Sequence, residues 1–119
     1  MLVEGQVHGG IAQGLGMALM EEYIPGRTEN LHDYLIPTIG DVPPIETIII
    51  EDPDEHGPYG AKGLGEHVLI PTAPSILNAI YHAVGVRISE VPSTMKQLTG
   101  QASHLIFSGF TTSFIIASP

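Results

Sequence analysis

"GQVHGGIAQGLGMALM", residues 5–20, decides the fold as far as the sequence shows it, because the stretch contains no Asp, Glu, Lys or Arg. At the helical spacing of about 100° per residue, its aliphatic residues gather on one broad arc, which is typical of a helix face packed on a core. These residues are Val7, Ile11, Ala12, Leu15, Ala18 and Leu19. We predict a helix over residues 6–22.

The opposite arc carries small and amide residues where a surface helix carries charges. It consists of Gln6, Gly9, Gly10, Gln13, Gly14 and Gly16, together with Met17 and Met20. Each Gly inside a helix costs about 1 kcal/mol relative to Ala, so some close approach must offset that loss. Two interpretations stay open: tight packing against another helix or a sheet, or a bulky ligand that Gln6 or Gln13 hydrogen-bonds.

Composition excludes several classes of protein. The chain has 119 residues, enough for one domain, and its hydrophobic content of 43% argues against disorder. Its charged fraction of 14% is low for a soluble domain, so we expect another polypeptide to cover part of its surface. A net charge of -9 without a Lys/Arg cluster argues against nucleic acid and anionic membranes as partners.

Two further features bear on the compartment. The chain has no cysteine, which excludes disulfides and thiolate sites within it and fits a reducing compartment. The start of the chain, "MLVEGQVHGG", lacks the basic and apolar regions of a secretory signal. We therefore expect a cytoplasmic location.

Elements of both classes are expected farther along the chain, so the predicted fold class is α+β. The β-branched stretch "IETIIIE", residues 45–51, predicts a strand, and "VRI", residues 86–88, predicts a shorter one. An apolar stripe predicts a helix over residues 72–84, with Thr72 as cap, Pro74 in the first turn and Gly85 as stop. "PSTMKQL", residues 92–98, begins another helix, capped by Ser93 or Thr94.

A glycine-rich loop, residues 52–65, ends at a lone carboxylate, Glu66; its glycines are Gly57, Gly60, Gly63 and Gly65. A phosphate-binding loop is excluded, because Lys62 is followed by Gly63 rather than Ser or Thr, and the glycine order reverses the dinucleotide fingerprint. A metal site within this chain is disfavoured, because Glu66 and His67 are adjacent and the six His residues are scattered. Two interpretations of Glu66 remain: a general base in a confined space, or a surface acid near a helix start.

The last segment, residues 99–119, changes character. No charged residue follows Lys96, and Ser, Thr and Gly interrupt the apolar residues without a clean period. The segment is too polar and too interrupted for a membrane span. We expect a poorly ordered tail of unclear origin that does not join the core.

Four segments, in this order and spacing, resemble the C-terminal part of one family's large subunit: "VEGQVHGGIAQGLGMALMEE", "LHDYLIPTIGDVPPIE", "GPYGAKGLGEHVLIPTAPSILNAI" and "VRISEVPSTMKQL". The family is that of the molybdopterin-binding large subunits of xanthine dehydrogenase, aldehyde oxidase and aerobic carbon monoxide dehydrogenase, the molybdenum hydroxylases. The resemblance covers residues 2–98. It implies that residues 1–98 are part of a molybdenum-cofactor-binding domain.

The resemblance also implies roles for particular residues. Glu66 would be the base beside molybdenum, Gln6 would contact the cofactor, and Gly63 and Gly65 would let the loop approach it. No residue of this chain would ligate the metal. The implied reaction is hydroxylation of an aldehyde, purine or N-heterocycle with oxygen from water, or oxidation of carbon monoxide. Electrons would leave through iron-sulfur clusters and FAD on partner chains or domains.

Two functions of different classes follow. The chain is a catalytic segment that works with the remainder of the large subunit and with iron-sulfur and FAD subunits. Alternatively, it is a truncated or frameshifted remnant that folds or forms a homo-oligomer without catalysis. Retention of Gln6 and Glu66 favours the first, whereas the short length and the unfamiliar tail favour the second.

Overall fold

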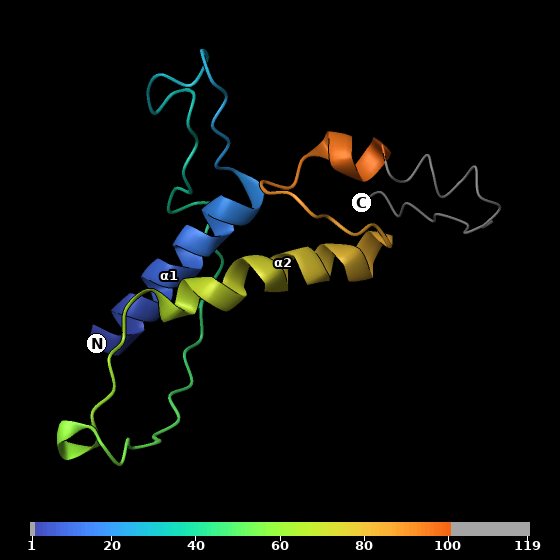
Figure 1. Cartoon of the computed structure of the whole chain (residues 1–119). Coiled ribbons are helices and arrows are strands. Elements are labelled where there is room, and N and C mark those ends of the chain that lie inside the picture. Colours follow the sequence, from blue (N-terminus) through green and yellow to red (C-terminus); the bar gives the residue numbers. More distant parts are fainter. Residues whose placement is uncertain (1, 101–119) are drawn as a thin grey trace.

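The computed structural model describes residues 2–100, in which two long helices cross and pack against each other (Figure 1). Helix α1 spans Leu2–Leu19 and helix α2 spans Leu69–Val84. Two 3-10 turns lie between them: η1 at Pro58–Gly60 and η2 at Glu66–Val68, which leads directly into α2. Residues 95–100 are also helical. The connection after α1 and the loop before η2 project from the helix pair in opposite directions (Figure 1).

Two glycines of α1 make the close approach of α2 possible. A Cβ atom built on Gly10 would lie 2.7 Å from the Cβ of Val68, and one on Gly14 would lie 2.5 Å from the Cβ of Thr72. Two carbon atoms in contact prefer about 3.5–4.0 Å, so neither position has room for a methyl group. For Gly10 and Gly14, therefore, the helix-packing interpretation of the glycine arc is confirmed.

The core is small and is made of short side chains. Its buried hydrophobic residues are Ala18, Ala73, Val86 and Ile88. Val86 and Ile88 follow Gly85, whose left-handed conformation (φ 73°) ends α2 and turns the chain back towards α1. The returning segment is fixed there by the N–H of Ser93, which donates to the carbonyl of Ala18 at 2.7 Å. Of the predicted stripe on α1, Leu19 stays partly exposed, so the helix pair alone does not bury that face.

Both long helices were predicted, but their ends differ. Helix α1 begins before residue 6 and stops at Leu19, where the N–H groups of Met20 and Glu21 both donate to the carbonyl of Gly16. Helix α2 begins at Leu69, because η2 already supplies a preceding turn. Thr72 is consequently no cap: its hydroxyl donates to the carbonyl of Val68 at 2.7 Å, inside the helix.

The predicted α+β class is wrong in its β part for residues 2–100, which contain helices and turns but no strand. Neither residues 45–51 nor residues 86–88 are paired with another segment. A strand is stable only when its backbone hydrogen-bonds to a neighbour, and the described chain offers none. The β-branched residues at 45–51 favour an extended backbone, but the described residues provide no strand with which that backbone could pair.

The helical segment at residues 95–100 begins as predicted, with Thr94 rather than Ser93 as its cap. The N–H of Gln97 donates to Thr94 Oγ1 at 3.4 Å, and the N–H of Thr94 donates to Gln97 Oε1 at 2.6 Å. This reciprocal pair is a capping box, which fixes a helix start. The segment continues through Thr99 and Gly100, and the rest of the predicted tail lies outside the described residues. None of the helices within residues 2–100 is long and apolar enough to cross a membrane.

Candidate functional site

The glycines of the loop before Glu66 divide into two kinds. Gly57 and Gly60 are required by the turn itself: Gly60 has a φ of 77°, and a Cβ atom on it would lie 2.8 Å from the Cβ of Pro53. Gly63 and Gly65 meet nothing within 4 Å of such a Cβ atom. No group in the described chain therefore explains why these last two positions lack a side chain.

Glu66 is the first residue of η2, and its side chain is exposed. The amide of Gln13, from the middle of α1, donates a hydrogen bond from Nε2 to Glu66 Oε1 at 3.3 Å. The two residues are 53 positions apart in the sequence. The loop glycines and the glutamine-bearing side of α1 therefore meet at one place, where the carboxylate lies.

The imidazole of His67 is hydrogen-bonded to the loop backbone rather than to Glu66. Its Nδ1 accepts the N–H of Gly65 at 3.1 Å, which directs the imidazole back to the loop. Within residues 2–100, no three or more His, Asp or Glu side chains gather as a metal site would require.

Gln6 lies two helical turns before Gln13 and, at about 100° per residue, on nearly the same side of α1. Its side chain is exposed and makes no hydrogen bond to any other described residue. Gly9, between the two glutamines, would meet nothing within 4 Å of an added Cβ atom. This side of α1 is consequently open over the length that separates Gln6 from Glu66.

The structure thus brings Gln13 to Glu66, whereas Gln6 stands farther along the helix. The sequence had left Gln6 and Gln13 as alternatives for hydrogen bonding, and the family resemblance assigned a role to Gln6 alone. The direct contact of Gln13 with the carboxylate could not be inferred from the sequence. The available signal was the spacing of seven residues, which puts both amides on one arc.

Comparisons with known proteins place the chain in a family. Residues 1–43 match the family described as "Molybdopterin cofactor-binding domain". The xanthine dehydrogenase molybdenum-binding subunit of Escherichia coli O157:H7 is 44% identical over 104 residues, which are 82% of this chain and 14% of that protein. Aldehyde oxidoreductase of Megalodesulfovibrio gigas is 36% identical over 98 residues, 78% of this chain and 10% of that protein.

A solved structure agrees with the sequence comparisons. Quinoline 2-oxidoreductase from Pseudomonas putida 86 superposes with a TM-score of 0.78 and 38% identity, over 87% of this chain and 14% of that one. The matched part of the chain therefore corresponds to about a seventh of the length of quinoline 2-oxidoreductase and to the same share of the Escherichia coli subunit. By sequence and by fold, the chain belongs to the family of molybdenum-binding large subunits that includes xanthine dehydrogenase and aldehyde oxidoreductase.

Proposed function

We propose that this chain is a catalytic segment of a molybdenum-cofactor hydroxylase and that Glu66 is its active-site base. The observation that carries the proposal is the hydrogen bond from Gln13 to Glu66, which joins the glycine loop to the amide side of α1 around one carboxylate. A surface acid at a helix start needs no such partner from a remote helix. The arrangement instead holds the carboxylate at a defined place beside an open surface.

The residues of this surface fit one wall of a pterin site. Gly63 and Gly65 leave space where side chains would stand, so a planar group can approach the loop backbone. Gln6 offers an amide that donates and accepts hydrogen bonds, as the heteroatoms of a pterin require. We assign cofactor contact to Gln6, Gly63 and Gly65. When bound, the cofactor would supply the two-electron oxidation of the substrate, with water as the source of the oxygen atom that the product gains.

Glu66 can hold a proton at a defined atom. Because Gln13 donates to Oε1, the second carboxylate oxygen, Oε2, is the one left to accept a proton from the attacking water-derived group. The donated bond also restricts rotation of the carboxylate, which favours a constant distance to the reacting atoms.

The chain supplies one wall only, so the other walls come from the remainder of the large subunit. We further propose that iron-sulfur and FAD subunits accept the electrons, and that the assembly is cytoplasmic, as the absence of cysteine fits. The substrate class is an aldehyde, a purine or another N-heterocycle, or carbon monoxide.

A second candidate function is non-catalytic self-association. It is favoured by the small core and by the large hydrophobic side chains that stay exposed, among them Leu2, Ile39, Ile70 and Met95. Such a chain would bury these residues in an oligomer and use neither Gln6 nor Glu66.

The two functions are separated by a chimera in which residues 2–98 replace the matched segment of the Escherichia coli subunit. Glu66→Gln should lower turnover at least ~10²-fold, the low end of a general base's contribution, and leave the molybdenum content unchanged. Glu22→Gln, at another exposed acid, is the control and should change neither. A Glu66→Gln chimera with full turnover would refute the base assignment. A chimera that retains the metal but does not turn over would favour the non-catalytic function.

A further inference from the structure

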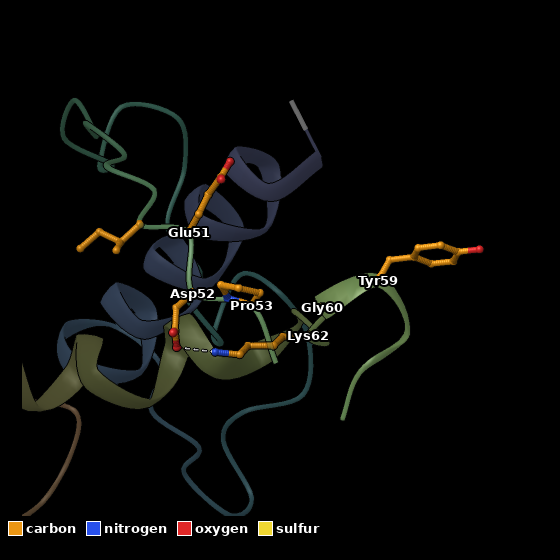
Figure 2. A pocket seen from close by; sticks show the side chains of 7 residues that line it. Glu51, Asp52, Pro53, Tyr59, Gly60 and Lys62 are labelled. Carbon is orange, nitrogen blue, oxygen red and sulfur yellow. Dashed lines mark hydrogen bonds and ion pairs between the residues drawn. The ribbon is translucent and has the colours of Figure 1, made fainter. Parts of the chain in front are cut away.

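An ion pair closes the loop that precedes Glu66. Lys62 Nζ lies 2.6 Å from Asp52 Oδ2, although the two residues are ten positions apart. Figure 2 shows the two side chains pointing towards each other, with Tyr59 pointing away from them. Lys62 is the only lysine or arginine in residues 28–86 of the sequence. No other basic side chain of that range could take its place.

Backbone hydrogen bonds complete the closed loop, residues 52–62. The N–H of Asp54 donates to the carbonyl of Gly60 at 3.1 Å. The N–H groups of Gly60 and Ala61 each donate at 3.0 Å to the carbonyl three residues earlier. A Cβ atom on Gly57 would overlap the carbonyl oxygen of Ala61, so the turn has no room for a side chain there. The closed loop is therefore a compact unit whose two ends meet at the ion pair.

Residues 63–65 connect the closed loop to Glu66. A Cβ atom built on either glycine of this connection would meet nothing within 4 Å. Glycine has more backbone freedom than any other residue, so the place of the connection depends on its two ends. Beyond one end, Gln13 of α1 holds Glu66 through the 3.3 Å hydrogen bond. At the other end, Lys62 holds the connection through its ion pair.

We propose that Lys62 is a positioning residue, which acts through Asp52 to hold residues 63–65, and with them Glu66, in place beside the bound cofactor. The inference rests on the proposed function, in which the backbone of residues 63–65 is part of the cofactor wall. The side chains of Lys62 and Asp52 are 49% and 82% exposed, so the pair contributes little to the stability of the whole chain. Its effect falls on the loop that it closes.

The chimera that carries residues 2–98 in the Escherichia coli subunit tests the proposal. Lys62→Met removes the charge and keeps the aliphatic stem. It should lower kcat about two- to fivefold, the value of an exposed ion pair, with unchanged KM and molybdenum content, because Glu66 then varies in its distance to the reacting group. Asp52→Asn should lower kcat by the same factor, and the double variant no further. Lys96→Met, at another exposed lysine, is the control and should change nothing.

Exchange of the two charges separates the ion pair from a role of the lysine stem. The combined substitutions Lys62→Asp and Asp52→Lys should restore most of the kcat that Lys62→Met loses, and Lys62→Arg should retain it. An ionic strength of about 1 M, where the screening length is about 3 Å, should reduce the difference in kcat between the parent chimera and Lys62→Met. A difference that neither the charge exchange nor salt removes would overturn the proposal.

Amide hydrogen exchange of residues 54–65 gives a readout that does not depend on activity. Lys62→Met should speed exchange in this range about two- to fivefold and leave exchange in α1 and α2 unchanged. Full kcat and unchanged exchange with Lys62→Met, beside a Glu66→Gln variant that loses turnover, would overturn the role of Lys62 alone. Full turnover with Glu66→Gln would instead refute the base assignment, and the exchange of residues 54–65 would still decide whether Lys62 holds the loop.

Discussion

Gly14 of α1 and Thr72 of α2 lie so close that a Cβ atom on the glycine would stand 2.5 Å from the Cβ of the threonine. Thr72 cannot simply rotate away, because its hydroxyl is bonded to the carbonyl of Val68. The contact therefore sets the distance between the two helices. It also sets where η2, and with it Glu66, lies relative to Gln13.

The first prediction concerns this contact. Gly14→Ala should lower the free energy of unfolding by about 1–3 kcal/mol, the usual cost of overpacking, reduced by the better helix propensity of Ala. Gly9→Ala is the matched control, because its Cβ would meet nothing within 4 Å, and it should raise stability by about 0.5–1 kcal/mol. Urea unfolding followed by helical circular dichroism measures both. Equal effects of the two substitutions would contradict the packing role of Gly14.

A second prediction separates the two glutamines of α1. In the chimera, Gln6→Ala should weaken cofactor retention about fivefold, because it removes one hydrogen bond worth about 1 kcal/mol. Gln13→Ala should instead leave the molybdenum content unchanged and lower turnover, because it frees the Glu66 carboxylate. Metal analysis by mass spectrometry beside steady-state turnover distinguishes them. Full metal retention and full turnover with Gln6→Ala would remove Gln6 from the site.

A third prediction concerns pH and the turn at residues 38–41. The hydroxyl of Thr38 (2.7 Å) and its N–H (2.8 Å) both donate to Asp41 Oδ2, and these bonds hold the pKa of Asp41 below its ordinary value. A lowered pKa stabilises the folded turn at pH values above the ordinary one, and this contribution is lost as the pH falls through the lowered pKa. The NMR resonance of the Thr38 amide reports the titration of Asp41. The midpoint of its shift with pH should therefore lie below the ordinary pKa of an aspartate. Thr38→Val should move this transition to a higher pH.

The fourth prediction concerns the chain alone, which should bind no molybdenum cofactor and hydroxylate nothing. One helix side and one loop bury too little of a pterin-sized ligand. The exposed apolar residues should make the chain self-associate. Metal analysis, dye reduction with an aldehyde or a purine, and light scattering check the three statements. Stoichiometric metal with turnover would show that the chain forms a complete site.

The sequence by itself determined the elements that depend on local interactions. The two-faced pattern of residues 5–20 predicted α1, Gly85 predicted the end of α2, and the spacing of Thr94 and Gln97 allowed a capping box that the structure contains. Helices and caps satisfy their hydrogen bonds within a few residues, so their signals are complete in the sequence. The glycine loop before Glu66 was equally visible, because four glycines lie within the ten residues that precede this acid.

The tertiary structure alone decided which groups meet. It showed that Gly10 and Gly14 of α1 serve packing, whereas a Cβ atom on Gly63 or Gly65 would meet nothing within 4 Å. It also brought Gln13 rather than Gln6 to Glu66, a contact across 53 residues that no local pattern encodes. The strand predicted at residues 45–51 did not form, because pairing depends on a second backbone that the described residues lack. Local propensity favours one backbone conformation for a residue. A strand or a site forms only when residues remote in the sequence supply the groups that it contacts.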